Sequence, residues 1–321
     1  MVPPGEREGT EGRPFFTVAI CTFNGGERLP PLVTAIREQA GSVTSVKMEI
    51  LIIDNNSTDN TSEVVRRLQS IGGTRLRLVH EPQQGIVHAR NRAVAEAPGP
   101  YLAFVDDDEL PVAGWLKTAL DALSREGADC VGGKIEVVYP GESRPQWMIS
   151  AVEAFLGRVD HGSVPVWITD RSMPIYSGNV AYNARALGAA LQFDPRYNRA
   201  GSGIGGGEDS VLFWRLLERG ARLRYRPEMV VHHHIEPRKL RRRYFLYLHF
   251  LAGIRHGEHQ VPDYPGQLVG VPPFMWVQLL KQLARTLGMV LRQDRYALRQ
   301  GMNLTHVAGS IVGRVRRWRR R

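Results

Sequence analysis

The first third of the chain alternates short apolar runs with stretches of helical periodicity. Residues 15–21 (Phe-Phe-Thr-Val-Ala-Ile-Cys) and residues 48–53 are apolar, rich in β-forming side chains and as long as a buried strand. Strands that alternate with helices predict a parallel α/β sheet. The predicted strands are 15–21, 48–53, 75–80 and 101–105, and the predicted helices are 28–39, the stretch up to Ser70 and the stretch after Gly85.

The middle of the chain continues this pattern less regularly. A helix is predicted over 113–125 and a strand over 128–138, and strand character returns at 176–182. Residues 139–175 contain four prolines and scattered aromatic residues, so we expect an irregular lid or acceptor region there. The glycine-rich residues 201–207 lead directly into a helix that starts at Glu208, and we expect them to form a loop that closes over substrate.

The C-terminal part is predicted to be helical and basic. Residues 238–256 combine arginines with aromatic side chains, residues 274–291 form an amphipathic helix, and residues 293–321 end in Arg-Val-Arg-Arg-Trp-Arg-Arg-Arg. Basic amphipathic helices lie on anionic membrane surfaces. They also pack on a protein domain with the arginine head groups in water. Both outcomes stay open from the sequence.

The strand predicted at 101–105 runs into consecutive carboxylates. Asp106, Asp107 and Asp108 would repel one another strongly in a dry site. A bound cation relieves that repulsion, and ligands that are all oxygen atoms favour Mg²⁺ or Mn²⁺. The alternative is a solvated acidic turn closed by Pro111.

Polar residues follow three of the predicted strands, after residues 21, 53 and 105. Open α/β sheets bind ligands in a crevice outside the carboxyl ends of their strands. The alternative is ordinary turn chemistry, since Asn, Asp and Ser also fill loops and cap helices. We expect one shared crevice lined by Thr22, Asn24, Asp54, Asn56, Asp106 and Asp108.

Two more groups of polar residues lie further along the chain. Glu208 and Asp209 after the glycine loop suit a closing active site, although acidic residues also favour the first turn of any helix. In a strand, His232 and His234 would face away from His233. Cys or further His residues at the spacing of a zinc site are missing around this triplet.

Composition adds a preference for anionic partners. The 321 residues carry a formal charge of +10 with a pI near 9.9, which suggests nucleic acid, an anionic membrane face or a phosphorylated substrate. Only two cysteines are present, so no disulfide framework is indicated. The polar N-terminus is unlike a secretory signal, and no uncharged apolar run approaches the ~18 residues of a membrane span. We expect a cytoplasmic protein, with peripheral contact to the inner face of the cell membrane as an open option.

Taken in order, these segments resemble family 2 glycosyltransferases with the GT-A fold, over roughly residues 15–256. The resemblance implies a Rossmann-like, nucleotide-binding mixed sheet flanked by helices, with a helical C-terminal extension. The segments that carry it are 18–24 (Val-Ala-Ile-Cys-Thr-Phe-Asn), 52–59 (Ile-Ile-Asp-Asn-Asn-Ser-Thr-Asp), 85–91 (Gly-Ile-Val-His-Ala-Arg-Asn), 104–108 (Phe-Val-Asp-Asp-Asp), 177–179 (Ser-Gly-Asn), Glu208-Asp209, and 230–234 (Val-Val-His-His-His).

The resemblance also implies roles for individual residues. The implied nucleotide and donor site comprises Thr22, Phe23, Asn24, Asp54, Asn56, Arg90, Asp106 and Asp107. Asp106 and Asp108 match the DxD motif and would hold Mg²⁺ or Mn²⁺, with His233 as a further metal ligand. Asp209 matches the catalytic base and has Glu208 beside it. Gly178, Asn179 and Trp147 are the expected acceptor contacts.

The chemistry supports these roles independently of the resemblance. A nucleotide-sugar donor leaves as a diphosphate, and a divalent cation stabilises the charge that develops on it. The acceptor hydroxyl needs a carboxylate to take its proton, and direct attack inverts the anomeric centre with a single base. UDP is the favoured nucleotide because it is the commonest in such enzymes. The acceptor stays open among a glycan, a lipid-linked sugar and a small molecule.

The predicted organisation is a disordered lead (1–14), a catalytic domain (15–235) divided at residue 110 into nucleotide-binding and acceptor halves, and a basic helical extension (236–321). One alternative is a sugar nucleotidyltransferase, but Gly25-Gly26-Glu27-Arg28 matches a phosphate loop only partly. A nucleic-acid-binding module is disfavoured because the positive charge lies at the C-terminal end rather than beside the acidic residues. A non-catalytic scaffolding relative is the third alternative.

Overall fold

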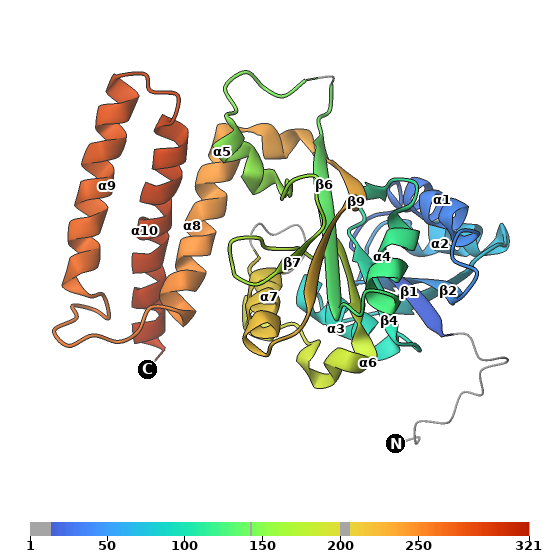
Figure 1. Cartoon of the computed structure of the whole chain (residues 1–321). Coiled ribbons are helices and arrows are strands. Elements are labelled where there is room, and N and C mark those ends of the chain that lie inside the picture. The colour runs from blue at the N-terminus through green and yellow to red at the C-terminus, as the bar shows by residue number, and fades with distance from the viewer. Residues whose placement is uncertain (1–13, 142, 200–205, 321) are drawn as a thin grey trace. The chain divides into compact units, whose positions relative to one another are not determined.

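The computed structural model describes residues 14–141, 143–199 and 206–320 (Figure 1). Nearly all of the predicted disordered lead, and residues 201–205 of the glycine loop, lie outside the described residues. The chain forms two compact units. The first contains residues up to 134 together with 160–193 and 209–232, and the second contains 135–159, 194–208 and 233–321.

The first unit is built on the sheet that the apolar runs predict. β1 (Phe15–Thr22) has parallel neighbours on both edges, and its residues after Phe15 are all buried, as in a sheet that helices cover on both faces. The predicted alternation is confirmed by α1 (Leu29–Ala40), β2 (Lys47–Asp54), α2 (Thr61–Ser70), β3 (Arg75–His80), α3 (Ile86–Glu96), β4 (Tyr101–Val105) and α4 (Trp115–Ser124).

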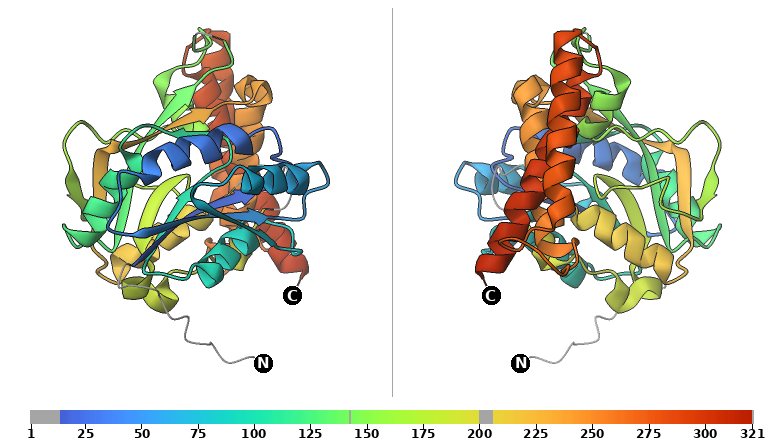
Figure 2. Two further views of the ribbon diagram at one scale, coloured as in Figure 1. Left: turned by 90° about the vertical axis from the view of Figure 1, so that its right-hand side faces the viewer. Right: turned by 90° about the vertical axis from the view of Figure 1, so that its left-hand side faces the viewer.

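The helices of this unit cover both faces of the sheet. α1 starts with a proline in its first turn, where the missing amide proton costs no helical hydrogen bond. α1 and α3 lie on opposite sides of β1 and β2 in the left view of Figure 2. This is the expected arrangement of a sheet whose parallel strands are joined by right-handed crossovers.

The second half of the sheet is mixed in direction. The strand order is β3-β2-β1-β4-β8-β6-β9-β5, and β8 (Asn179–Asn183) runs antiparallel to both β4 and β6 (Cys130–Val138). β9 (Leu223–His234) and β7 (Val166–Ile168) form a further antiparallel pair, and α7 (Glu208–Glu218) precedes β9. The mixed α/β sheet with flanking helices is therefore confirmed.

Two segments contain local structure that the sequence did not specify. The alternative of a solvated acidic turn does not extend to residue 109, because β5 (Glu109–Pro111) joins the sheet and buries Glu109. Residues 139–175 are also less irregular than predicted. They contain α5 (Ser150–Glu153), a 3-10 turn at Ala154–Leu156, and β7.

The second unit contains three long helices, α8 (Arg242–His259), α9 (Pro273–Leu291) and α10 (Ala297–Arg319), after a short 3-10 turn at Pro237–Leu240. Figure 1 shows α10 between α8 and α9. The predicted helical extension is confirmed. Within the described residues, none of these helices combines the length and apolar character that crossing a membrane requires.

Glycines bring α8 and α10 into direct backbone contact. A Cβ atom added at Gly309 would lie 2.0 Å from the carbonyl oxygen of Phe250, and one at Gly313 would lie 2.1 Å from that of Ile254. Gly253 and Gly257 on α8 make the same approach to α10. The two helices therefore pack through paired Gly-x-x-x-Gly stretches, in which only glycine permits the spacing.

Candidate active site

The carboxyl ends of β1, β2 and β4 lie side by side in the first unit. Thr22 is paired with Asp54 in the register of β1 and β2, and Asn55 N donates to Thr22 O at 2.9 Å. β4 pairs on the other side of β1 and ends just before Asp106. The parallel register thus brings the three predicted polar loops to one edge of the sheet.

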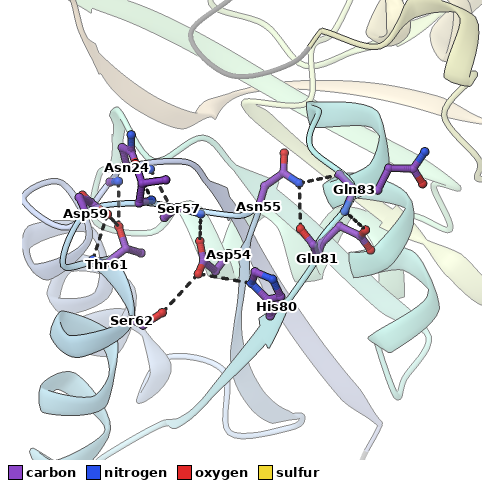
Figure 3. A network of polar contacts seen from close by, with 12 residues as sticks. Asn24, Asp54, Asn55, Ser57, Asp59, Thr61, Ser62, His80, Glu81 and Gln83 are labelled. Carbon is purple, nitrogen blue, oxygen red and sulfur yellow. Dashed lines mark hydrogen bonds and ion pairs between the residues drawn. The ribbon is translucent and has the colours of Figure 1, made fainter.

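Asp54 lies at the centre of a polar network at this edge (Figure 3). It is 3% exposed, and its carboxylate accepts hydrogen bonds from Ser57 N at 3.0 Å and Ser62 Oγ at 3.3 Å. His80 Nδ1, at the end of β3, is 3.7 Å from the same carboxylate. Asp54 was predicted to bind the base of the nucleotide, and that role stays a prediction. In the structure it holds the loop after β2.

The loops after β1 and β2 are tied together (Figure 3). Asn24 N donates to Ser57 Oγ at 2.9 Å, and Thr58 N donates to Asn24 Oδ1 at 2.8 Å. Asn24 and Asn56 have φ angles of 51° and 63°, in the left-handed region that asparagine adopts more readily than most residues. Both are exposed, so they remain accessible to a ligand as predicted for the nucleotide site.

Asp107 points back into the first loop. Thr22 Oγ1 donates to Asp107 Oδ2 at 2.5 Å, and Arg28 donates to the same oxygen at 2.8 Å. Burial raises the pKa of the Asp107 carboxyl, while Arg28 and Thr22 oppose that shift. A Cβ at Gly25 would lie 2.0 Å from Thr22 Oγ1, so glycine is required at this point. Thr22 and Asp107 were expected to face the nucleotide, yet here they bind each other.

Arg90 connects two of the predicted functional carboxylates. It is 1% exposed, and its guanidinium donates to Asp106 Oδ1 at 3.1 Å and to Asp209 Oδ1 at 2.8 Å. Ser177 Oγ also donates to Asp209 Oδ1, at 2.5 Å. The Arg90 side chain further stacks on Phe193, with 5.5 Å between the guanidinium carbon and the ring centre. Asp106 and Asp209 lie 16 and 119 positions from Arg90 in the sequence, and they share this one buried cation.

Glu109 supplies a fourth carboxyl group behind the DxD motif. It is 3% exposed and packs against Gly178, where an added Cβ would lie 2.6 Å from each carboxyl oxygen. Burial raises its pKa well above the usual range, and the nearby charges of Asp106 and Asp108 raise it further. Gly178 was an expected acceptor contact, and its close approach to Glu109 explains why a glycine is present.

Asn179 forms internal hydrogen bonds. Its side-chain oxygen accepts from Trp115 Nε1 at 2.7 Å, and its amide donates to the carbonyl oxygens of Lys134 and Met229, each at 2.8 Å. Its contact with an acceptor stays a prediction. These three bonds give the side chain a structural task in linking α4, β6 and β9.

Three predicted residues belong to the second unit. Glu208 begins α7 and is 2% exposed. His233 lies near Gly157, with 3.3 Å from its Nδ1 to a Cβ added there. Trp147 is half-buried, packs edge-on against Phe245 and lies under the guanidinium of Arg242. Their catalytic, metal-binding and acceptor-binding roles stay predictions. Among the described residues, no three Cys, His, Asp or Glu side chains are arranged as a metal site.

Sequence reasoning assigned no role to His80, Arg28 or Ser177. The position of His80 near Asp54 could have been anticipated, because His80 ends the alternating strand β3, and β3 is adjacent to β2 in a Rossmann-like strand order. Arg28 and Ser177 could not, because their contacts with Asp107 and Asp209 span 79 and 32 residues and depend on loop geometry. Phe23 is half-buried beside this site, and its carbonyl oxygen accepts from Arg28.

Comparisons with known proteins identify the class of protein and its family. Residues 17–187, more than half of the chain, match the model of glycosyl transferase family 2. The chain belongs to this family and is a glycosyltransferase. This resolves the choice against the sugar nucleotidyltransferase and the nucleic-acid-binding module.

Two curated relatives illustrate the similarity. Glycosyltransferase AglE of Haloferax volcanii is 34% identical over 131 residues, which cover 41% of this chain and 42% of that protein. Succinoglycan biosynthesis protein ExoM of Rhizobium meliloti is 26% identical over 242 residues, covering 75% of this chain and 73% of that protein. The chain therefore matches less than half of the length of AglE but most of the length of ExoM.

Solved structures confirm the GT-A fold. The mannosyltransferase PcManGT of Pyrobaculum calidifontis, in complex with GDP-Man and Mn²⁺, superposes with a TM-score of 0.61 at 19% identity, over 95% of this chain and 88% of that one. Residues 1–349 of S. aureus TarS, in complex with UDP-GlcNAc, give a TM-score of 0.55 at 16% identity, over 92% and 90% of the two chains.

Proposed function

We propose that this glycosyltransferase transfers a sugar from a nucleoside-diphosphate donor, with UDP favoured, to an acceptor hydroxyl, and that it inverts the anomeric centre. The Arg90 bridge between Asp106 and Asp209 carries this proposal. It sets a donor-side carboxylate and the proposed base at a fixed separation, as a direct displacement requires. PcManGT and TarS, which share the fold, bind GDP-Man and UDP-GlcNAc respectively.

The donor chemistry of the site fits a divalent cation. Asp106, Asp107, Asp108 and Asp209 bring carboxylate oxygens to this part of the protein, and the described ion pairs of these groups involve Arg28 and Arg90. Oxygen ligands of this kind suit Mg²⁺ or Mn²⁺. Asp106 and Asp108 would hold the ion, which when bound offsets the charge of the departing diphosphate.

Asp209 is the proposed base. Both of its hydrogen bonds, from Arg90 and Ser177, go to Oδ1, and within the described residues Oδ2 accepts no hydrogen bond. Oδ2 then takes the proton of the acceptor hydroxyl as its oxygen attacks the sugar. Glu208, next to Asp209 in sequence, is proposed as a second catalytic carboxylate.

A thermal-shift screen with nucleoside diphosphates and nucleotide sugars, with and without Mn²⁺ or Mg²⁺, tests the donor site. A ligand at a hundredfold excess over its Kd stabilises the protein by about 2.7 kcal/mol. We expect a metal-dependent shift with one nucleotide that is lost in Asp108→Ala and kept in Asp170→Ala, a surface control. Equal shifts without metal, or no shift with any nucleotide, would contradict the donor site.

Replacement of Asp209 by Asn tests the base. The amide oxygen of Asn can still accept from Arg90 and Ser177, so donor binding should persist. Transfer should fall by roughly 10²–10⁴, which is the usual contribution of a general base. Release of nucleoside diphosphate at the wild-type rate in Asp209→Asn would remove Asp209 from the mechanism.

A further inference from the structure

α9 has a continuous apolar stripe on its exposed side. The stripe follows helical spacing along the whole helix, and each member is at least 40% exposed: Trp276 40%, Leu280 66%, Leu283 42%, Leu287 54% and Val290 55%. A surface helix normally turns such a stripe toward the core. In α9 Met275 is the one residue of the helix that is buried.

The side of α9 that faces α10 combines apolar and polar residues. Met275 and Leu279 belong to an apolar cluster with Val307 and Ile311 of α10. Gln300 Nε2 on α10 donates to Gln282 Oε1 at 2.5 Å, which places Gln282 in the seam between the two helices. The seam thus uses only part of the apolar surface of α9 and leaves the stripe exposed, which indicates that the stripe is covered by a partner.

The segment around the stripe holds the positive charge of the chain. Residues 264–321 contain eleven Lys and Arg residues and one carboxylate, Asp294, so their formal charge of +10 equals that of the whole protein. Lys281, Arg285 and Arg292, the last of which directly follows the helix, lie on the face of α9 opposite the stripe. All three are exposed. Apolar side chains on one face of a helix and cations on the other are the pattern of helices that lie in the interface of an anionic membrane.

The loop that leads into α9 also exposes apolar side chains. Arg314 of α10 is 2% exposed and fixes the loop through hydrogen bonds to Gly270 O at 2.8 Å, Val261 O at 3.0 Å and Asp263 at 2.7 Å. In the fixed loop Leu268 is 68% exposed. Exposed aromatic residues at the same end of the helices are Tyr264, Phe274 and Trp318, which are the residue types enriched at the lipid–water boundary.

We propose that the α9 stripe forms a docking surface for an anionic lipid bilayer, on which α9 lies parallel to the membrane plane with its cations on the side turned away from the lipid tails. A second copy of the chain is the other apolar partner that would fit the stripe. Its α9 and α10 would bring another +10 of charge against the first, and like charges oppose that contact. This surface goes beyond the transfer reaction, since it concerns where the enzyme works.

Co-flotation of the full chain with phosphatidylcholine vesicles, with and without phosphatidylglycerol, tests this surface directly. The first variant is Leu280→Ser/Leu283→Ser/Leu287→Ser, which removes the centre of the stripe at exposed positions. The second is Lys281→Gln/Arg285→Gln/Arg292→Gln. The matched control is Ile71→Ser/Val164→Ser, which removes apolar side chains that are 73% and 65% exposed elsewhere. Circular dichroism and thermal unfolding establish that each variant is folded.

We expect the wild type and the control to float with the anionic vesicles only. The leucine variant should bind at least roughly tenfold more weakly, and the cation variant should lose roughly fivefold per removed charge at low salt. Equal flotation of the leucine variant and the wild type would overturn the membrane surface. So would a wild-type dimer that dissociates in the leucine variant while no species binds vesicles. No donor is needed in this assay, so a failed donor screen does not affect its result.

Discussion

Substitution of Arg90 by Met tests whether the buried Arg90 bridge stabilises the protein more than an ordinary surface ion pair does. Arg90 is almost inaccessible, and it provides the cation for both Asp106 and Asp209. Met keeps much of the side-chain volume and the contact with Phe193 but removes all of the donors. The two carboxylates then lose their shared partner in a site that is only partly open to water.

The expected loss follows from the burial of the three groups. Removing one member of a buried ion pair destabilises a protein by about 3–5 kcal/mol, because a charge is left uncompensated. The Asp106 and Asp209 side chains are 32% and 20% exposed, so water offsets part of that cost. We therefore expect about 3 kcal/mol, which corresponds to a fall in Tm of roughly 4–5 °C for a chain of this size.

Urea unfolding followed by tryptophan fluorescence measures this difference, with Arg92→Met as the matched control. Arg92 lies on the same helix and pairs with Glu96 at 3.0 Å, but its side chain is 41% exposed. An exposed pair of this kind contributes at most about 0.5 kcal/mol. Unfolding of Arg90→Met and Arg92→Met at the same urea concentration would contradict a large stabilising contribution of the buried Arg90 bridge. A folded Arg90→Met protein should also lose sugar transfer, since the base is no longer held.

Two further predictions concern packing and the cysteines. Gly309→Ala should destabilise the protein by about 1–3 kcal/mol in thermal unfolding, because its Cβ would meet the Phe250 carbonyl, whereas Gly288→Ala, which meets nothing within 4 Å, should stabilise it by up to about 1 kcal/mol. Equal effects would contradict the backbone contact of α8 and α10. Burial raises the pKa of Cys21 to about 12, so alkylation near pH ~8.5 should modify it only after unfolding. The stability that this protonated thiol contributes is complete below that pH. It falls as the pH rises toward 12, because the unfolded chain releases its proton first. Rapid alkylation of the native protein would refute the buried position.

The succession of strands and helices in the first third of the chain was predictable because it follows from local pattern. The apolar runs that became β1, β2 and β4 are each followed at once by polar residues, and parallel pairing brings those ends together. The direction of individual side chains was not predictable in this way. Asp107 turns toward Arg28 while its neighbour Asp106 turns toward Arg90, and nothing in three consecutive aspartates indicates that difference.

The Arg90 bridge shows why long-range polar contacts escape sequence reasoning. Arg90 was predicted to lie near the nucleotide because it belongs to a recognisable segment after Gly85. Its link to Asp209 depends on α3 and α7 meeting across 119 residues of chain. The same holds for Asn179, which was identified with its neighbours in a motif. Its partners Trp115, Lys134 and Met229 come from three separate elements.

Helical periodicity alone does not determine which part of the apolar face of α9 is covered by the protein. The amphipathic pattern of residues 274–291 left packing on the protein open beside contact with a membrane. The structure directs Gln282 to the seam with α10 and leaves the stripe exposed. Where local pattern and packing disagree without an internal compensation, a functional contact is the expected cause. The formal charge of +10 in residues 264–321 gives that contact its sign, since an anionic bilayer offsets this charge while its apolar interior covers the exposed stripe.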